Sequence, residues 1–401
     1  MVPDTQLNNR MKVIKQCLCC HNSDLFVVLD LGRQPLANSF HTADQSLELY
    51  ELQLLGCSQC WHTQLSVAVD PEKLFCNYLY VSGTSQTGKN YFDWVANHYS
   101  QQFVGSVLDI ACNDGSQLDS FSKLGWSCWG VDPAKNLFES SSQRHHVTCD
   151  FWNSKTAKQL PKFDLITAQN VFAHTAEIDQ FLQACATVMH DRTILVIQTS
   201  QAEMFENNEF DTIYHEHISF FSTSSMQAAI RRNGLCLNHV YKTDIHGTSY
   251  VFEIGLHSHP TGSVDEFLNQ EQSRYCREFY RDYANQALQC LSQLKQHLVQ
   301  VKSQGYRVVG YGAAAKGMTV INAGQLDLDY IVDDNPLKQG LLCPGSNIPV
   351  HSPRVLQNEN SPLVIVPLAW NFYTEIVQRC CALRPQALDH FVRYFPELVI
   401  D

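Results

Sequence analysis

Two C-x-x-C pairs, Cys17 to Cys20 and Cys57 to Cys60, constrain the fold of this chain more than any other feature. A stretch typical of β-strands separates the pairs, and two such pairs can close a tetrahedral four-thiolate zinc site. A small polar segment gains much of its folding free energy from such a metal. No carboxylate of the segment is placed to activate a zinc-bound water, so the spacing predicts a structural zinc. A redox pair or a coincidental spacing is the alternative.

Length and charge limit the classes of protein that this chain can belong to. Its 401 residues predict two to three domains of ~100–200 residues. The net charge of −12 argues against a nucleic-acid surface but not against a nucleotide-sugar, because backbone amides can hold a diphosphate. The sequence shows no run of ~18 apolar residues and no signal-peptide pattern at Met1, and most of its 16 cysteines are scattered singly. We therefore expect a cytoplasmic protein that binds neither membranes nor nucleic acid.

The stretch 106–118 predicts a strand, a tight turn containing glycine, and a helix. A following strand ends in Asp132, a position where a carboxylate can bind ribose hydroxyls. The sequence lacks G-x-G-x-x-G here, which favours an adenosine cofactor without a pyrophosphate over a dinucleotide. Further strands at 163–171 and 193–199 alternate with helices and predict a parallel sheet with ligands at the carboxyl ends of its strands. The residues expected to contact the cofactor are Asp109, Asn113, Asp114, Gly115, Asp132, Gln169 and Asn170.

Two other segments lie next to this predicted edge. The stretch 74–90 is rich in Tyr, Ser, Thr and Gly, and is either a loop that covers a ligand or a surface connection before a helix at 91–102. Within it, the phenols of Tyr78 and Tyr80 could donate hydrogen bonds to a substrate. His174 follows Asn170 at the functional edge of the sheet, and it is either a site residue or the start of a helix.

The segment Tyr214-His-Glu-His217 holds a phenol, a carboxylate and two imidazoles in consecutive positions. In an extended strand, Tyr214 and Glu216 would share one face while the two histidines share the other. In a loop, these side chains could converge on one ligand. A histidine that a carboxylate or phenol orients is suited to removing a carbon-bound proton.

The C-terminal part begins with a stretch of helical spacing at 264–304, which predicts one long helix between domains. A second unit of strand, glycine loop and helix follows at 307–317. The amides of Gly312, Ala313 and Ala314 and the side chain of Lys316 are expected to hold the diphosphate of a nucleotide, although glycine there also serves close packing. Asp333 and Asn335 either contact a ribose or cap a turn.

These motifs occur in an order that resembles the SAM-dependent C-methyltransferases of deoxysugar biosynthesis. The resemblance rests on the two cysteine pairs, Asp30–Asn38, Asn113–Gly115, Asn170–His174 and Tyr214–His217. It continues through Gly310–Gly317, Val332–Gly340 and Ala369–Phe372, so that it covers essentially the whole chain.

The resemblance implies methylation at C3 of a nucleotide-linked 4-keto-deoxysugar, with SAM and a structural zinc as cofactors. By similarity His217 is the base, Glu216 and Tyr214 orient it or stabilise an enolate oxygen, and Tyr80 and His174 lie beside the substrate. The implied α/β architecture is a zinc-binding domain at 1–75, a doubly wound SAM-binding domain at 76–245, and a Rossmann-like nucleotide-sugar domain at 246–401. A monomer is favoured.

One departure from the family pattern concerns the cofactor turn. Relatives usually show an acid-x-Gly before the Asn-Asp-Gly turn, whereas this chain has Asp109-Ile-Ala111, which places a Cβ where glycine is usual. Alanine is small, so we expect SAM still to fit. The rival interpretations are an NAD-type sugar dehydrogenase or isomerase that uses the Gly310 loop, and a non-enzymatic zinc-dependent binding module.

Overall fold

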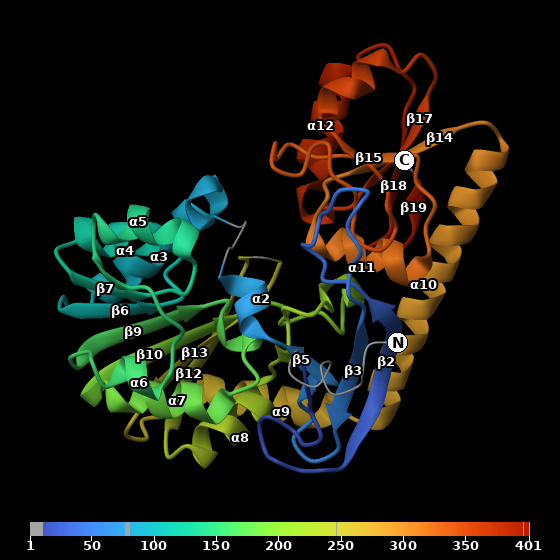
Figure 1. Ribbon diagram of the computed structural model, residues 1–401. Coiled ribbons are helices and arrows are strands. Elements are labelled where there is room, and N and C mark those ends of the chain that lie inside the picture. Colours follow the sequence, from blue (N-terminus) through green and yellow to red (C-terminus); the bar gives the residue numbers. More distant parts are fainter. Residues whose placement is uncertain (1–10, 77–80, 246, 396, 401) are drawn as a thin grey trace. The chain divides into compact units, whose positions relative to one another are not determined.

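The computed structural model describes residues 11–76, 81–245, 247–395 and 397–400 (Figure 1). Tyr78 and Tyr80 lie outside the described residues. The chain forms two compact units, which alternate along the sequence. The first unit comprises Met1–Phe26, Leu55–Ala202 and Ile218–Cys276, and the second comprises Val27–Leu54, Glu203–His217 and Arg277–Asp401. The three consecutive domains expected from the sequence stay a prediction.

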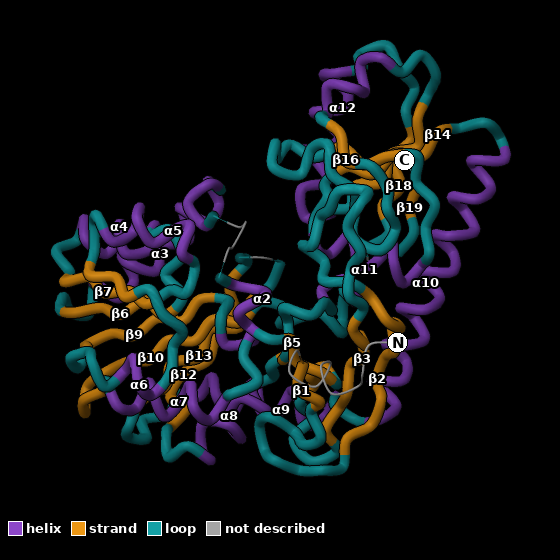
Figure 2. Tube along the Cα trace, viewed as in Figure 1, coloured by secondary structure: helices purple, strands orange, loops and turns teal. Residues whose placement is uncertain are grey.

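A seven-stranded sheet runs through the described part of the first unit, in the order β12-β13-β10-β9-β6-β7-β8 (Figure 2). The five strands from β10 to β8 are parallel, as the alternation of strands and helices predicted. Strand β13 is antiparallel to both β10 and β12, which the alternation did not predict, because a short connection joins β12 to β13 without a crossover helix. The strands are β6 (Ser106–Ile110), β7 (Ser127–Val131), β8 (His146–Thr148), β9 (Phe163–Gln169), β10 (Met189–Thr199), β12 (Cys236–Thr243) and β13 (Ser249–Gly255).

Helices cover both faces of this sheet, and apolar side chains fill the space between the layers. Val107 and Leu165 are buried on the face covered by α3 and α4, while Leu108 and Ile166 are buried on the face covered by α7 and α8. A central strand such as β6 is apolar on both faces for this reason. The helices are α2 (Pro71–Phe75), η1 (Ser82–Thr84), α3 (Gln86–Ser100), α4 (Ser116–Lys123), α5 (Lys135–Ser142), α6 (Ser154–Ala157), η2 (Phe172–His174), α7 (Ile178–Thr187), α8 (Thr223–Arg232) and α9 (Gly262–Arg274).

Two further sheets among the described residues have the orders β1-β5 and β11-β4-β3-β2, and all of their strands except β11 come from residues 11–69. The first cysteine pair lies between β1 and β2, and the second begins at the end of β3 and precedes β4, so both pairs stand among these strands. The strands are β1 (Met11–Val13), β2 (Leu25–Gln34), β3 (Tyr50–Cys57), β4 (Thr63–Leu65), β5 (Val67–Val69) and β11 (Ser219–Phe220).

The second unit contains a six-stranded sheet within the described chain, in the order β16-β15-β14-β17-β18-β19. All of its pairings are parallel except that of β18 with β19. Strand β14, a glycine loop and helix α11 follow one another here, as the sequence predicted for residues 307–317. The elements are η3 (Phe210–Thr212), α10 (Arg277–Ser303), β14 (Arg307–Tyr311), α11 (Ala315–Gly324), β15 (Tyr330–Val332), β16 (Val350–His351), η4 (Pro353–Asn358), β17 (Leu363–Pro367), η5 (Trp370–Phe372), α12 (Tyr373–Leu383), β18 (His390–Arg393) and β19 (Val399–Ile400).

The long helix predicted at 264–304 is wrong in one respect, because the structure has two helices there, α9 and α10. Tyr275 ends α9 with an extended backbone (ψ 117°), and its ring is buried instead of continuing the helical stripe. The spacing of apolar residues did not reveal this break, because Tyr275 continues the helical periodicity. A buried aromatic residue at that spacing is compatible with a helix and with a turn.

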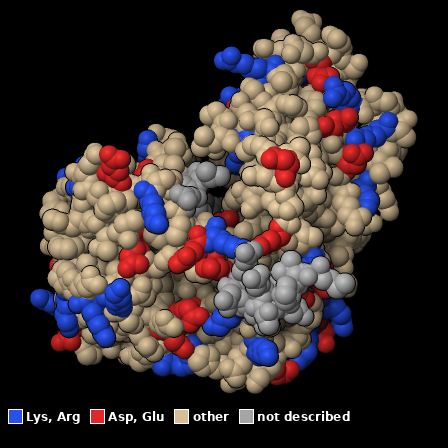
Figure 3. All heavy atoms as spheres, viewed as in Figure 1, with Lys and Arg blue, Asp and Glu red and all other residues tan. Residues whose placement is uncertain are grey.

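The surface carries charges of both signs. On the face shown in Figure 3, Lys and Arg side chains are interspersed with Asp and Glu side chains. No helix in the described part of the chain combines the length and apolarity that a membrane crossing requires.

Candidate functional site

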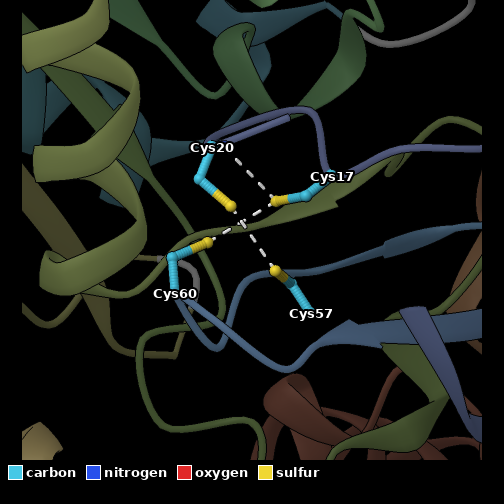
Figure 4. Close-up of side chains that lie close together, drawn as sticks. All are labelled: Cys17, Cys20, Cys57 and Cys60. Atoms are coloured by element: carbon cyan, nitrogen blue, oxygen red, sulfur yellow. Dashed lines mark hydrogen bonds between the residues drawn. The ribbon is translucent and has the colours of Figure 1, made fainter. Parts of the chain in front are cut away.

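Four cysteine side chains of the first unit converge on one point (Figure 4). The sulfur atoms of Cys17, Cys20, Cys57 and Cys60 lie within 4.8 Å of one another, and the Sγ–Sγ distances of Cys17–Cys60 and Cys20–Cys57 are both 3.5 Å. Zn–S bonds of about 2.3 Å in a tetrahedron separate the sulfurs by roughly 3.8 Å, so the four thiols fit zinc after a slight expansion. Within the described residues the cluster includes no histidine or carboxylate, as expected for a closed structural site.

The two cysteine pairs have the same local turn. The N–H of His21 donates to the carbonyl of Cys17 at 2.9 Å, and the N–H of Trp61 donates to that of Cys57 at 3.1 Å. His21 and Trp61 both have a positive φ, 62° and 57°. This shared geometry points both sulfur atoms of a pair to the same side. Cys19 stays outside the cluster, and burial raises the pKa of its thiol, so it remains neutral.

Asp132, just after β7, holds the turn that follows β6. Its Oδ2 accepts the N–H of Asn113 at 2.8 Å, and its Oδ1 accepts the N–H of Ala134 at 2.7 Å. Burial raises the pKa of this carboxyl, while the two backbone donors lower it. Each oxygen has a second lone pair, so the predicted ribose contact is compatible with these bonds. Asp132 therefore also has a structural task that sequence did not show.

The backbone of the turn is left-handed at three positions. Ala111, Asn113 and Gly115 have φ values of 61°, 52° and 81°. Glycine and asparagine adopt this region readily, whereas an alanine there is strained. The residue that departs from the family pattern, Ala111, thus occupies a position that favours glycine.

Asp109, within β6, lies beneath this turn. Its Oδ1 accepts the hydroxyl of Thr167 at 2.8 Å and the Nε2 group of Gln117 at 3.0 Å. Burial raises the pKa of the Asp109 carboxyl to about 7. A cationic ligand at this edge would stabilise the ionised form of Asp109 and would therefore lower the pKa of its carboxyl again.

The segment predicted either to cover a ligand or to connect surface elements lies against the same turn. The N–H of Ser82 donates to Oδ1 of Asn113 at 2.9 Å, and the N–H of Gly83 donates to Oδ2 of Asp114 at 3.1 Å. A Cβ on Gly83 would lie 2.2 Å from Oγ of Ser116 and 2.5 Å from Oδ2 of Asp114, so a larger residue here would displace these two side chains. Helix α3 then begins at Gln86, earlier than the predicted 91.

The remaining candidates of the first unit lie at the end of β9 and just beyond it. Oε1 of Gln169 accepts the Tyr91 hydroxyl at 3.4 Å, and Oδ1 of Asn170 accepts the backbone N–H that follows β10 at 3.1 Å. His174 stacks on Phe75, with ring centroids 5.5 Å apart. Burial lowers the pKa of His174 to about 4, so at neutral pH its ring is an uncharged hydrogen-bonding group.

The segment Tyr214–His217 of the second unit is a turn, and the loop alternative is the one observed. The hydroxyl of Tyr214 lies 3.0 Å from Nε2 of His217, and the two ring centroids are 4.1 Å apart. Nδ1 of His217 lies 2.8 Å from the carbonyl oxygen of Thr212. A carbonyl only accepts, so Nδ1 carries the proton of the neutral ring and the Nε2 lone pair faces Tyr214.

The other two members of this segment point elsewhere. Oε1 of Glu216 accepts Nδ2 of Asn38 at 2.6 Å. Nε2 of His215 lies 3.2 Å from the carbonyl oxygen of Glu51, its ring packs on that of Tyr50, and burial lowers its pKa to about 4. His215 is thus packed away from the Tyr214–His217 pair.

In the C-terminal glycine loop, two of the three amides predicted to hold a diphosphate already have partners in the protein. The N–H of Gly312 donates to the end of β15 at 2.8 Å, and the N–H of Ala313 donates to Oδ2 of Asp333 at 2.6 Å. Oδ1 of Asp333 accepts the N–H of Asn335 at 2.8 Å, so this acid caps a turn as Asp132 does. Ala314 is the N-cap of α11 and makes no side-chain cap hydrogen bond, so no capping side chain occupies the first N–H groups of that helix.

Sequence reasoning missed a contact beside this loop. Nζ of Lys316 lies 4.7 Å from the ring centroid of Trp370, and Nε1 of Trp370 donates to Oδ2 of Asp211 at 2.7 Å. Asn38 was missed as well. Asn38 and Trp370 stand inside the motifs Asp30–Asn38 and Ala369–Phe372 quoted above, whereas Asp211 lies three residues before Tyr214.

Comparison with known proteins gives consistent matches along the chain. Residues 17–75 match a family described as a putative zinc binding domain, 80–240 a methyltransferase domain, and 244–396 a C-methyltransferase C-terminal domain. Over 388 residues the chain is 27% identical to C-methyltransferase NovU of Streptomyces niveus, with 92% of each chain covered.

Other relatives match only part of the chain. A stretch of 98 residues is 31% identical to the ubiquinone biosynthesis O-methyltransferase of Rhodopseudomonas palustris, covering 23% of this chain and 39% of the relative. Among solved structures, magnesium protoporphyrin IX methyltransferase from Synechocystis with bound SAM covers 42% of this chain and 79% of its own, with 13% identity and a TM-score of 0.33.

Proposed function

We propose that this chain, which belongs to the SAM-dependent C-methyltransferases that combine a zinc-binding domain with a C-methyltransferase C-terminal domain, methylates C3 of a nucleotide-linked 4-keto-deoxysugar through an enolate. The class of enzyme, its cofactor SAM and its zinc follow from the family. The sugar, the reacting carbon and the residue roles are our proposal.

The observation that carries the proposal is the Tyr214–His217 pair. A 4-keto group acidifies the neighbouring C3–H, and a base must then remove that proton. Nδ1 of His217 is held by the Thr212 carbonyl at 2.8 Å, which leaves Nε2 as the basic atom. His217 is only 7% exposed, so few waters compete for that lone pair. A positioned base of this kind contributes typically ~10²–10⁴-fold to the rate.

The phenol of Tyr214 serves the oxygen of the enolate. In the free protein its hydroxyl lies 3.0 Å from Nε2 of His217. Once the substrate separates the pair, that O–H can donate to the developing negative oxygen while Nε2 takes the proton. Glu216, held by Asn38, supports this turn. A donor aimed at such an oxygen contributes about 10²–10³-fold.

Bound SAM supplies the methyl group as an electrophile for the enolate carbon. The chain's part is to hold the cofactor at the turn after β6, with Asp132 as the partner of the ribose. Asp109 offers a buried carboxylate whose raised pKa, about 7, would fall beside a positive charge such as the cofactor's ammonium. Gln169, Asn170 and His174 contribute neutral hydrogen-bonding groups at the same edge.

The nucleotide diphosphate is assigned to the glycine loop of the second unit. The first turn of α11 offers backbone N–H groups that no side chain caps, and Lys316 adds a positive charge. The zinc is structural, since four thiolates complete its coordination. An NAD-type dehydrogenase and a non-enzymatic binding module are set aside, because the likeness to a C-methyltransferase extends over 92% of the chain.

The experiment has two stages. Purified enzyme and SAM are first incubated with a panel of dTDP-, GDP- and UDP-linked 4-keto sugars, and mass spectrometry identifies the substrate by a gain of one methyl group. Exchange of the C3 hydrogen with D₂O is then followed in the presence of a non-reactive SAM analogue, which stops the reaction at the enolate. The His217→Asn variant should lose this exchange, while its binding of SAM stays nearly unchanged.

The matched control is His215→Asn, the same change two residues earlier in a side chain that faces the Glu51 carbonyl. It should exchange C3 hydrogen at close to the parent rate. If His217→Asn also exchanges at the parent rate, His217 is not the base. Failure of every 4-keto sugar to accept a methyl group would refute the proposed substrate class.

A further inference from the structure

Asp211 is a buried carboxylate that the reaction proposed above does not use. It lies in η3, just before the Tyr214–His217 turn, and its side chain is fully shielded from solvent. Its Oδ2 accepts Nε1 of Trp370 at 2.7 Å. Its Oδ1 has no hydrogen-bond partner at normal geometry among the described residues, although the N–H of Thr212 is near enough to lower its pKa. A buried carboxylate with so few partners weakens the fold, so a functional reason for its presence is expected.

The surroundings of Asp211 join the nucleotide loop to η3. Lys316 stands over the Trp370 ring, and its positive charge stabilises the Asp211 carboxylate. From the same helix, α11, the hydroxyl of Thr319 donates to the carbonyl of Ile213 at 3.0 Å. Helix α11 thus contacts the η3 segment, defined here as η3 and its C-cap Ile213, in two ways. The charge of Lys316 acts on Asp211, and Thr319 donates a hydrogen bond to Ile213.

The η3 segment in turn fixes the imidazole of His217. The carbonyl oxygen of Thr212, the residue after Asp211, lies 2.8 Å from Nδ1 of His217, and its hydroxyl lies 3.3 Å from the same atom. A rotation of this peptide would remove the partner of Nδ1 and would allow the proton to move to Nε2. The ring could then no longer accept a proton at Nε2.

We infer that Asp211 is a positioning residue for His217: its carboxylate, held by Trp370 and Lys316, fixes the η3 turn whose Thr212 carbonyl keeps the proton of His217 on Nδ1. This inference rests on the proposed role of His217 as the base. The inference adds the residues that keep His217 in its reactive tautomer. One of them, Lys316, belongs to the loop assigned to the nucleotide.

The charged and titratable groups that face Asp211 set the pH range in which it acts. Burial and the nearby Glu209 raise its pKa, to about 6, while Lys316 and Trp370 lower it. Tyr283 and Cys290 of α10, and Tyr394, also interact with the Asp211 charge, and the pKa values of all three groups are raised, mainly by burial. We expect the anchoring charge to be lost as pH falls through about 6.

Two variants and one control test the inference. Asp211→Asn keeps the shape and an oxygen that can accept from Trp370, but it removes the charge. Trp370→Phe removes the indole N–H and keeps an aromatic ring for Lys316. The control, Trp126→Phe, deletes an indole hydrogen bond of 2.8 Å, to Ser100, in the first unit.

Four quantities are measured on the intact protein: C3–H exchange and turnover with the substrate from the panel, the unfolding temperature, and the ¹⁵N signals of His217. The His217→Asn spectrum identifies those signals. Asp211→Asn should lower kcat and the exchange rate by about 10- to 100-fold, as expected for a misplaced catalytic group, with a much smaller change in KM. The fraction of His217 with its proton on Nδ1 should fall. The kcat profile should lose the step near pH 6 that belongs to Asp211 and should keep the acid limb that protonation of the base itself produces. Trp370→Phe should change kcat, the exchange rate and the tautomer fraction in the same direction. Trp126→Phe should lower only the unfolding temperature, because it truncates a buried, hydrogen-bonded indole without touching His217.

The results separate this inference from the proposed function. If His217→Asn abolishes exchange while Asp211→Asn and Trp370→Phe keep the parent kcat and the parent tautomer, Asp211 does not position the base. A lower unfolding temperature with unchanged kcat and tautomer assigns Asp211 a purely structural role and also overturns the inference. Parent-like exchange in His217→Asn refutes the base itself, whatever the Asp211 variants do.

Discussion

Replacing Ala111 by glycine should stabilise this protein, although the change deletes a methyl group. The φ of Ala111 is 61°, in the left-handed region, where an L side chain costs about 1–2 kcal/mol. Glycine removes this strain but adds freedom to the unfolded chain, which costs about 0.4–1 kcal/mol. The expected net gain in the free energy of unfolding therefore lies between about 0 and about 1.6 kcal/mol. Its central value of about 0.8 kcal/mol corresponds to roughly 2–3 °C in unfolding temperature.

The assay is urea and thermal unfolding of the Ala111→Gly variant, with and without SAM. Gln325→Gly is a second case at a helix end, with φ 48°, and should also gain stability. Ala134→Gly is the opposite control, since its φ of −72° gives glycine no advantage, and it should lose stability. The stabilisation of Ala111→Gly by SAM should match that of the parent.

One result would refute this reasoning. If Ala111→Gly unfolds at lower urea than the parent while Gln325→Gly gains stability, the Ala111 methyl group contributes more by packing than its backbone loses by strain. The departure from the family pattern would then be an adaptation of this chain.

Three further predictions concern the metal, the cofactor and pH. Cys57→Ser should lower zinc content and unfolding temperature together, measured by metal analysis and thermal unfolding, whereas the exposed Cys149→Ser should change neither. Asp132→Ala should weaken SAM binding, measured by calorimetry, by ~1.5–3 kcal/mol, and Asp132→Asn by less, because an amide oxygen still accepts one backbone N–H; equal affinity in all three proteins would remove the assignment. The carboxyl of Asp109 has a folded pKa of about 7, above its ordinary 3.8, so its contribution to stability is present below about pH 4 and is lost as pH rises through 7. Asp109→Asn should therefore gain stability relative to the parent at about pH 8 but not at about pH 4, in urea titrations.

The α/β fold class was predictable because its signals are local. The run Val107-Leu-Asp-Ile110 has an apolar residue on each face, Val107 on one and Leu108 and Ile110 on the other, which is typical of a central parallel strand. The acid at Asp132 marks the end of the next strand. The cysteine spacing likewise predicted the four sulfur atoms that the structure brings together. Each signal needed only the geometry of a strand or of a short turn.

Other features were not predictable, because they depend on contacts between distant segments. The break at Tyr275 between α9 and α10 follows from burial of that ring, and the spacing looked the same with or without it. The amides of Gly312 and Ala313 were predicted to bind a ligand. In the structure the N–H of Gly312 donates to the last residue of β15, and the N–H of Ala313 donates to Asp333.

The sequence by itself determined which chemical groups this protein has and which of them are neighbours along the chain: four thiols in two pairs, and a phenol, a carboxylate and two imidazoles in one turn. Tertiary structure decided which of these groups face each other. His215 and His217 are two histidines of the same four-residue segment. In the structure His215 faces the Glu51 carbonyl, whereas His217 pairs with Tyr214. The physical reason is that the direction of a side chain in a turn depends on the partners that the folded backbone offers it. The Thr212 carbonyl oxygen lies 2.8 Å from Nδ1 of His217, whereas the Glu51 carbonyl oxygen lies 3.2 Å from Nε2 of His215.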